Sequence, residues 1–175
     1  AARARAGGGH LIWLGIHWLD LAMFVTGAPI VAATGFTANV GGQPLDIEDS
    51  AVVSMRFAPG FLGTLTSGYY LDRGYHSHLK IWGENGWLEI DPVNEKRLRW
   101  QFNKGDQAGT THESPPGSPP SSYTPLVREA VVSCAIGSPP PVSNADSLRA
   151  IQTVTSDASF LGQGTYASVM TMEET

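Results

Sequence analysis

The densest group of residues that could do chemistry lies near the start of the chain, in the segment GGGHLIWLGIHWLD from Gly7 to Asp20. Three consecutive glycines let a backbone bend sharply and approach a ligand closely. His17 follows in or near the first turn of an expected helix. Because the positive end of a helix disfavours the imidazolium form, a histidine there tends to stay neutral and can accept a hydroxyl proton. The oxidation of an alcohol requires this chemistry, since the hydroxyl loses its proton as the hydride leaves the carbon.

Two other interpretations of this histidine stay open. A single histidine on an apolar helix face is more often a hydrogen-bonded core residue, and Asp20, three residues later, could be its partner. A metal-dependent lyase or isomerase could instead use His10, His17 and His76. The seven-residue spacing of the first two, without nearby cysteine, gives a zinc site little support.

A second polar cluster, YYLDRGYHSH from Tyr69 to His78, is expected at a hairpin tip or loop. It offers Arg73, Tyr75 and His76 as candidate substrate contacts, because aromatic faces and an arginine fork suit a sugar or a carboxylated sugar. An ordinary polar turn is the alternative. The acidic residues Asp46, Glu48 and Asp49 are interpreted as a solvated loop ahead of a strand, not as a catalytic carboxylate pair.

Helices are expected at both ends of the chain. Apolar residues at three- and four-residue spacing predict a first helix over residues 14–26, stopped by Gly27. A second helix is expected to open at Thr124-Pro125 and to end at Gly137, with Cys134 buried on its apolar stripe. A third begins at a cap on Asn144. One face of this last helix is expected to carry Ile151, Val154, Ala158 and Leu161.

The middle of the chain has the two-residue period of strands. Residues 51–57 alternate strictly between apolar and polar side chains, and turn sequences at 58–60 and at Asn85-Gly86 separate strand-like runs. Residues 113–125 are too rich in proline and serine for a regular element. Strands followed by helices predict an α+β fold with a large, mainly antiparallel sheet covered by helices on one face. The open face, with several aromatic residues in the strands, is expected to mediate oligomerisation.

The composition narrows the class of protein. The chain has 175 residues, 42% of them hydrophobic and 15% charged, with a net charge of −5, and we expect one globular domain. The negative charge and the scattered basic residues argue against a nucleic-acid partner. No window is long and apolar enough to span a membrane. A single cysteine suits a reducing compartment, and we expect the cytoplasm.

The glycine-rich segment, read together with Gly15, His17, Asp20 and Gly27, resembles the signature that opens the C-terminal domain of the Gfo/Idh/MocA oxidoreductases. The resemblance extends to Glu48-Asp49, to the turn at residues 82–86 and to the closing helix near Asn144. It implies that residues 1–175 are the C-terminal substrate-binding and oligomerisation domain of such an enzyme, a fragment that lacks the N-terminal domain. It also implies that His17 contacts the substrate hydroxyl.

The resemblance places a sugar- or cyclitol-like substrate beside His17, where Gly9, His10, Trp13 and Trp18 are our candidate contacts. Polyol-oxidising members often carry an aspartate four residues before the histidine, and this chain has Trp13 there. We do not expect these 175 residues to contain the family's nucleotide-binding domain. No G-x-G-x-x-G occurs, and Gly162-Gln163-Gly164 follows a helix, so it does not form a dinucleotide cradle.

We therefore expect NAD or NADP in the full-length protein, no cofactor bound by this chain alone, and no turnover by this chain alone. The expected reaction is oxidation of a secondary alcohol, or reduction of the ketone, in a sugar-like molecule. The alternative is a non-catalytic carbohydrate-binding or assembly module, in which Trp13 and Trp18 would stack on a sugar ring.

Overall fold

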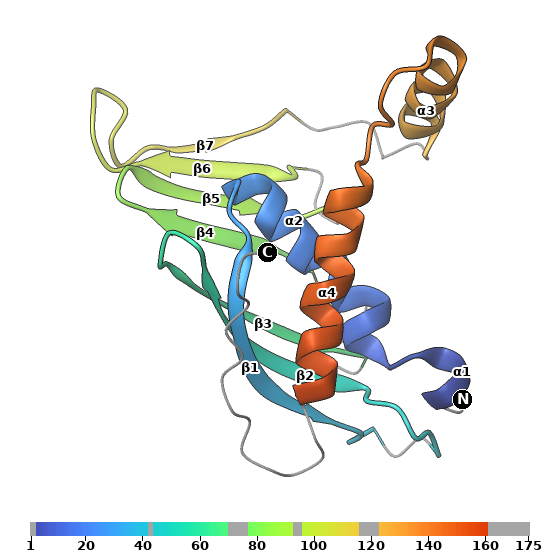
Figure 1. Ribbon diagram of the computed structural model, residues 1–175. Helices are drawn as coiled ribbons and strands as arrows, with labels where there is room; N and C mark the ends of the chain where they lie inside the picture. Colours follow the sequence, from blue (N-terminus) through green and yellow to red (C-terminus); the bar gives the residue numbers. More distant parts are fainter. Residues whose placement is uncertain (1–2, 42–43, 70–76, 93–95, 116–122, 161–175) are drawn as a thin grey trace. The chain divides into compact units, whose positions relative to one another are not determined.

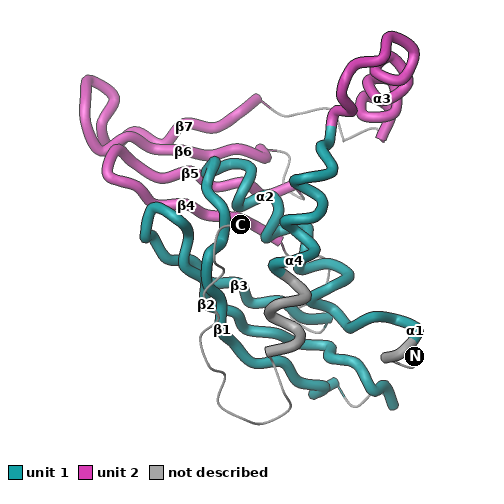
Figure 2. The backbone as a smooth tube through the Cα atoms, viewed as in Figure 1, with its two compact units in different colours: residues 1–71, 142–175 teal, residues 72–141 magenta. Residues whose placement is uncertain are grey.

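The computed structural model describes residues 3–41, 44–69, 77–92, 96–115 and 123–160, and the chain divides into two compact units (Figure 2). Unit 1 comprises residues 1–71 and 142–175, and unit 2 comprises residues 72–141. Unit 1 thus combines both ends of the chain, and unit 2 is formed by its middle.

Unit 1 packs helices against one face of a three-stranded antiparallel sheet with strand order β1-β2-β3 (Figure 1). Helix α4 contacts both α2 and β1, and the π-helical turn η1 contacts β3. The elements of this unit in chain order are α1 (Arg3–Ala6), η1 (Leu11–Gly15), α2 (Ile16–Thr26), β1 (Ile30–Ala38), β2 (Ser50–Phe57), β3 (Leu62–Gly68) and α4 (Asn144–Phe160).

The predicted alternation of residues 51–57 is confirmed in β2, where every second side chain is buried. Val53 is fully buried, and Leu11 and Leu19 from η1 and α2 are almost completely inaccessible to solvent. Burying such side chains stabilises the fold by roughly 1.5 to 3 kcal/mol each. The apolar core of this unit consists of Leu11, Leu19, Ala22, Met23, Ala28, Ile30, Ala32, Ala51, Val53, Met55, Phe57 and Ala150.

The other face of this sheet is open to solvent within the described residues. Phe36 and Val52 are register partners there, with exposed fractions of 68% and 49%. Leu62 on β3, opposite the exposed Arg56, is exposed to 77%. Helices on one face and an open opposite face match the predicted layering.

Unit 2 contains a four-stranded antiparallel sheet with strand order β4-β5-β6-β7. Its elements are β4 (Leu79–Gly83), β5 (Gly86–Ile90), β6 (Leu98–Phe102), β7 (Thr111–Glu113) and α3 (Thr124–Ile136). The expected hairpin between β4 and β5 is present, but Glu84 and Asn85 form its turn and Gly86 pairs with Gly83. Gly86 has a φ of 152°, and a Cβ there would lie 1.9 Å from the carbonyl oxygen of Gln101. Glycine is therefore needed here for close approach to β6.

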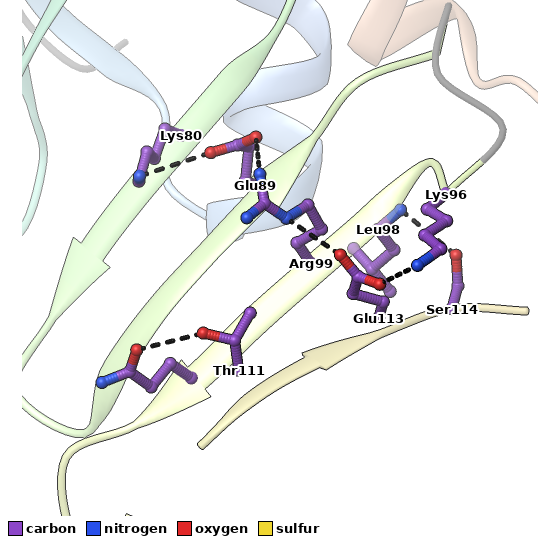
Figure 3. A network of polar contacts seen from close by, with 9 residues as sticks. Lys80, Glu89, Lys96, Leu98, Arg99, Thr111, Glu113 and Ser114 are labelled. Carbon is purple, nitrogen blue, oxygen red and sulfur yellow. Dashed lines mark hydrogen bonds and ion pairs between the residues drawn. The ribbon is translucent and has the colours of Figure 1, made fainter. Parts of the chain in front are cut away.

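One face of the unit 2 sheet carries a ladder of alternating charges across all four strands (Figure 3). Glu89 lies 3.3 Å from the Lys80 ammonium and 3.4 Å from the Arg99 guanidinium, which in turn lies 3.5 Å from Glu113. Lys96 also pairs with Glu113. These partly exposed pairs fix the register of the strands more than they add stability, since each such pair contributes about 1 kcal/mol or less.

The strand register also fixes where the aromatic residues of unit 2 point, which the sequence left open. Trp82 and Trp87 are cross-strand partners on the charged face, and the Lys80 ammonium lies over both rings. Trp100 lies on the opposite face, stacked on His112. The predicted α+β fold with antiparallel strands is confirmed, with the strands hydrogen-bonded as two sheets.

The two C-terminal helices have the expected bounds but differ in detail. Helix α3 begins at Thr124, carries Pro125 in its first turn and ends at Ile136, with Gly137 as the C-cap at a φ of 69°. The expected burial of Cys134 is wrong: its side chain is exposed, as are most apolar side chains of this helix. Within the described residues, only Ser133 of this helix is buried.

Helix α4 is capped one residue earlier than expected. The hydroxyl oxygen of Ser143 accepts a 3.0 Å hydrogen bond from the N–H of Asp146 and the hydroxyl donates to its carboxylate. The buried side chains of this helix include Ala150 and Thr153, whereas Ile151 is 51% exposed, so the expected apolar face is rotated. The other residues assigned to that face lie outside the part whose side chains are described.

Candidate functional site

The helical segment that carries His17 starts earlier than the apolar periodicity predicts. His10 already has helical dihedral angles, and the N–H of Ile16 bonds to the carbonyl of Leu11, five residues back. This spacing defines the π-helical turn η1, which runs directly into α2. Single π turns inside helices widen the backbone and occur frequently at functional sites.

His17 is the second residue of α2, and its side chain is exposed. The expectation that His17 lies at the free N-terminal end of a helix is wrong. Because η1 precedes α2 without a break, the free helix end lies near His10. Among the described residues His17 makes no hydrogen bond or ion pair, and Asp20 is likewise exposed and does not bond to it. The core-histidine interpretation is therefore not supported, and the imidazole is free for an external partner.

Four side chains on one face of η1 and α2 point to solvent: Trp13, His17, Asp20 and Phe24. Their spacing of three and four residues gives a continuous stripe, opposite to the buried Leu19 and Met23. The indole N–H of Trp13 donates a 3.1 Å hydrogen bond to the carbonyl of Gly8. Trp18 lies beside this stripe and is half-buried.

Gly9 provides the close approach that the glycine run predicts, but the partner is the protein itself. A Cβ on Gly9 would lie 1.8 Å from the carbonyl oxygen of Glu48. The same carbonyl accepts a 3.0 Å hydrogen bond from the N–H of His10. Gly9 is buried, and it lets the start of the helical segment pack closely against the backbone just ahead of β2. The resulting turn has no room at Gly9 for a phosphate.

The His10 side chain faces the interior and not the exposed stripe. Its Nδ1 shares a 2.5 Å hydrogen bond with the hydroxyl of Ser67 on β3, and its ring meets the ring of Tyr69 edge-on at 4.3 Å. Burial lowers the pKa of His10, an effect that the nearby Glu48 and Asp49 carboxylates only partly oppose. In the described residues His10 is thus a packing residue that ties η1 to β3.

The neutral form of His10 predicts a pH dependence of stability. The unfolded imidazole, with a pKa near 6.5, takes up a proton at a pH where the folded one does not. We expect the free energy of unfolding to decrease as the pH falls below about 6.5 and to level off below the pKa of the folded state. Urea unfolding at pH values on both sides of 6.5 measures this dependence.

His10→Gln is the matched control, since a glutamine amide can still bond to Ser67 but does not titrate. In this variant the free energy of unfolding should change less with pH over the same range. An equal pH dependence in both proteins would assign the effect to other groups.

The interpretation of Asp49 as part of a solvated loop is wrong. Its side chain is buried and accepts hydrogen bonds from the N–H groups of Val40 and Gly41 and from the hydroxyl of Ser50, at 2.7 to 3.1 Å. Burial acts to raise the pKa of Asp49, but these hydrogen bonds outweigh it and hold the pKa below its usual range. The carboxylate therefore fixes the turn after β1, while Asp46 is solvated as expected.

Several predicted contacts lie outside the described residues, namely Arg73, Tyr75, His76 and the segment Gly162-Gln163-Gly164. In the part of the chain that the structure describes, no three histidine, cysteine or acidic side chains cluster as metal ligands would. No described helix is both long and apolar enough to cross a lipid bilayer.

Comparisons with known proteins show what the chain is similar to. Residues 1–89 match the family model described as the GFO/IDH/MocA C-terminal domain. A myo-inositol 2-dehydrogenase from Thermotoga maritima is 26% identical over 151 residues, which cover 84% of this chain and 45% of that protein.

Two solved structures show the same fold. An aldose-aldose oxidoreductase from Caulobacter crescentus, complexed with glycerol, has a TM-score of 0.78 at 23% identity, covering 97% of this chain and 49% of that chain. The WlbA dehydrogenase from Bordetella pertussis, in complex with NADH and UDP-GlcNAcA, has a TM-score of 0.71 at 19% identity, covering 96% of this chain and 46% of that one. The chain thus spans about half the length of these relatives.

Proposed function

Because this chain belongs to the Gfo/Idh/MocA family of oxidoreductases, we propose that it is the substrate-binding and assembly half of an NAD(P)-dependent enzyme. The intact enzyme interconverts a secondary alcohol and a ketone in a sugar- or cyclitol-like molecule. One observation carries the proposal: the His17 imidazole is exposed, makes no hydrogen bond within the described residues and follows a glycine turn that holds its helix in place.

In this proposal His17 handles the proton of the reacting hydroxyl. A neutral imidazole accepts a hydroxyl proton during oxidation and returns it during reduction, because the same base serves both directions. Beside His17 on the same helix face, the exposed Trp13 indole and Asp20 carboxylate would contact the rest of the substrate.

In this proposal the dinucleotide site lies outside the described residues. The backbone of Glu48 occupies the space beside Gly9, which argues against a pyrophosphate cradle at this glycine turn. The hydride carrier, NAD or NADP, would be held by a separate nucleotide-binding domain, and this chain alone would bind no cofactor and give no turnover. NADH in the solved complex of the Bordetella pertussis relative supports the choice of nicotinamide chemistry.

The assembly role follows from the open face of the unit 1 sheet. Exposed large apolar side chains such as Phe36 and Leu62 are costly to leave in water and suit an interface between copies of the chain. We propose a homo-oligomeric enzyme of the cytoplasm, with a small sugar-like molecule as its other partner.

The test is an assay of the full-length enzyme, with the nucleotide-binding half present. We expect it to reduce NAD or NADP when supplied with myo-inositol or an aldose, and we expect this chain alone to give no reduction. Absence of turnover with any polyol, aldose or cyclitol, in either direction and with either nucleotide, would overturn the proposal.

Trp13 favours a second candidate, a non-catalytic carbohydrate-binding or assembly module. Its indole is 58% exposed, as a stacking surface for a sugar ring would be. In that case the full-length protein would bind sugars, detected by a change in tryptophan fluorescence, without any turnover.

A further inference from the structure

Trp13 differs from the three tryptophans of unit 2 in what lies against its ring. The Lys80 ammonium lies 5.4 Å and 4.5 Å from the ring centroids of Trp82 and Trp87, and Trp100 is stacked on His112. No aromatic ring or cation of the described residues lies on the indole of Trp13, which is 58% exposed. A large apolar surface is therefore presented to solvent without a partner.

Hydrogen bonds of both the ring and the backbone restrain the orientation of Trp13. Its ring N–H donates to the carbonyl of Gly8 at 3.1 Å, and its backbone N–H donates to the carbonyl of Gly9 at 3.1 Å. Gly9 is itself held against Glu48 by the close backbone contact described above. A ring held in this way loses little conformational freedom on binding, which favours a preorganised contact surface.

Polar groups that complement a polyol lie next along the same stripe. His17 is one helical turn beyond Trp13, and side chains at that spacing have Cβ atoms about 5–6 Å apart. Asp20, a further turn on, is an exposed carboxylate that makes no ion pair within the described residues. It can accept hydrogen bonds from ring hydroxyls, and its charge disfavours an acidic sugar.

We propose that Trp13 determines substrate specificity by stacking on the apolar C–H face of a neutral cyclic polyol, a pyranose or a cyclitol, whose hydroxyl then reaches His17. This proposal rests on the proposed function. An open-chain polyol has no rigid C–H face to lie on the indole, so the site selects rings over open chains.

The test uses the full-length enzyme and compares kcat/KM for two neutral polyols with equal numbers of hydroxyls, cyclic myo-inositol and open-chain sorbitol. We expect a preference for the ring in the wild type. Trp13→Leu should reduce that preference by about tenfold, and Trp13→Phe should keep most of it, because the aromatic face remains while the indole N–H is lost.

Phe24→Leu is the matched control, since Phe24 is 82% exposed on the same stripe two turns beyond His17. It should leave the ring preference unchanged. An enzyme that turns over but has the same ring preference in the wild type and in Trp13→Leu would overturn the role of Trp13 and leave the oxidoreductase assignment standing. An enzyme that oxidises neither polyol, nor any other, would overturn the proposed function itself.

Discussion

Replacing His17 by alanine in the full-length enzyme is expected to lower kcat by at least about tenfold and to leave the fold intact. A positioned general base typically contributes about 10²-fold to 10⁴-fold to such a reaction. His17 is exposed and makes no hydrogen bond within the described residues, so its removal breaks no internal contact there. The measurement is steady-state turnover together with thermal unfolding of the variant.

Two further variants of the same experiment separate proton transfer from binding. His17→Gln keeps a side chain that can hydrogen-bond a hydroxyl but cannot take its proton, so it should be as slow as His17→Ala. Added imidazole should restore part of the turnover of His17→Ala. An unchanged kcat in both variants, or a change confined to KM, would remove the assignment of His17 as the proton-handling residue.

Much of the fold is predictable because it follows from local patterns. The strict alternation over residues 51–57 can bury one face only as a strand, and β2 shows it. The helix ends predicted at Gly27 and Gly137 are confirmed. Both residues adopt the left-handed conformation that glycine tolerates, with φ values of 64° and 69°.

Several departures from prediction depend on contacts between distant parts of the chain. Gly15, the last residue of η1, packs against β3, and a Cβ added there would lie 3.4 Å from the Leu65 side chain. His10 turns inward because Ser67, 57 residues later, offers its hydroxyl. Asp49 is buried because the turn after β1 presents two backbone N–H groups to it. No local pattern in the sequence encodes these partners.

The prediction that His17 contacts the substrate rested partly on its place at a helix end, and that premise is wrong. Sequence reasoning placed His17 at a helix end, and the structure places it within a continuous helical segment. His17 is distinguished by its exposure beside Trp13 and Asp20. This exposure depends on which face of the helix is buried. The apolar periodicity of α2 contains this information, because Leu19 and Met23 define the inner face.

Replacing Gly9 by alanine is the variant expected to damage this chain most. The added Cβ would lie 1.8 Å from the carbonyl oxygen and 2.7 Å from the carbonyl carbon of Glu48, which are both backbone atoms. A flexible side chain could move aside, but here either the glycine turn or the chain ahead of β2 must shift. We expect the free energy of unfolding to decrease by about 3 kcal/mol or more, measured by urea denaturation.

Gly7→Ala is the control that separates the steric clash at Gly9 from the general effect of replacing a glycine in this turn. A Cβ on Gly7 would meet no atom within 4 Å, although the φ of 77° still disfavours alanine there. The cost of this variant should be about 1 kcal/mol, the penalty of the left-handed conformation alone. Since Gly9 seats the segment that carries Trp13 and His17, Gly9→Ala should also abolish turnover of the full-length enzyme, whereas Gly7→Ala should retain it. Equal stability of the two variants would show that the contact between Gly9 and Glu48 does not hold the site in place.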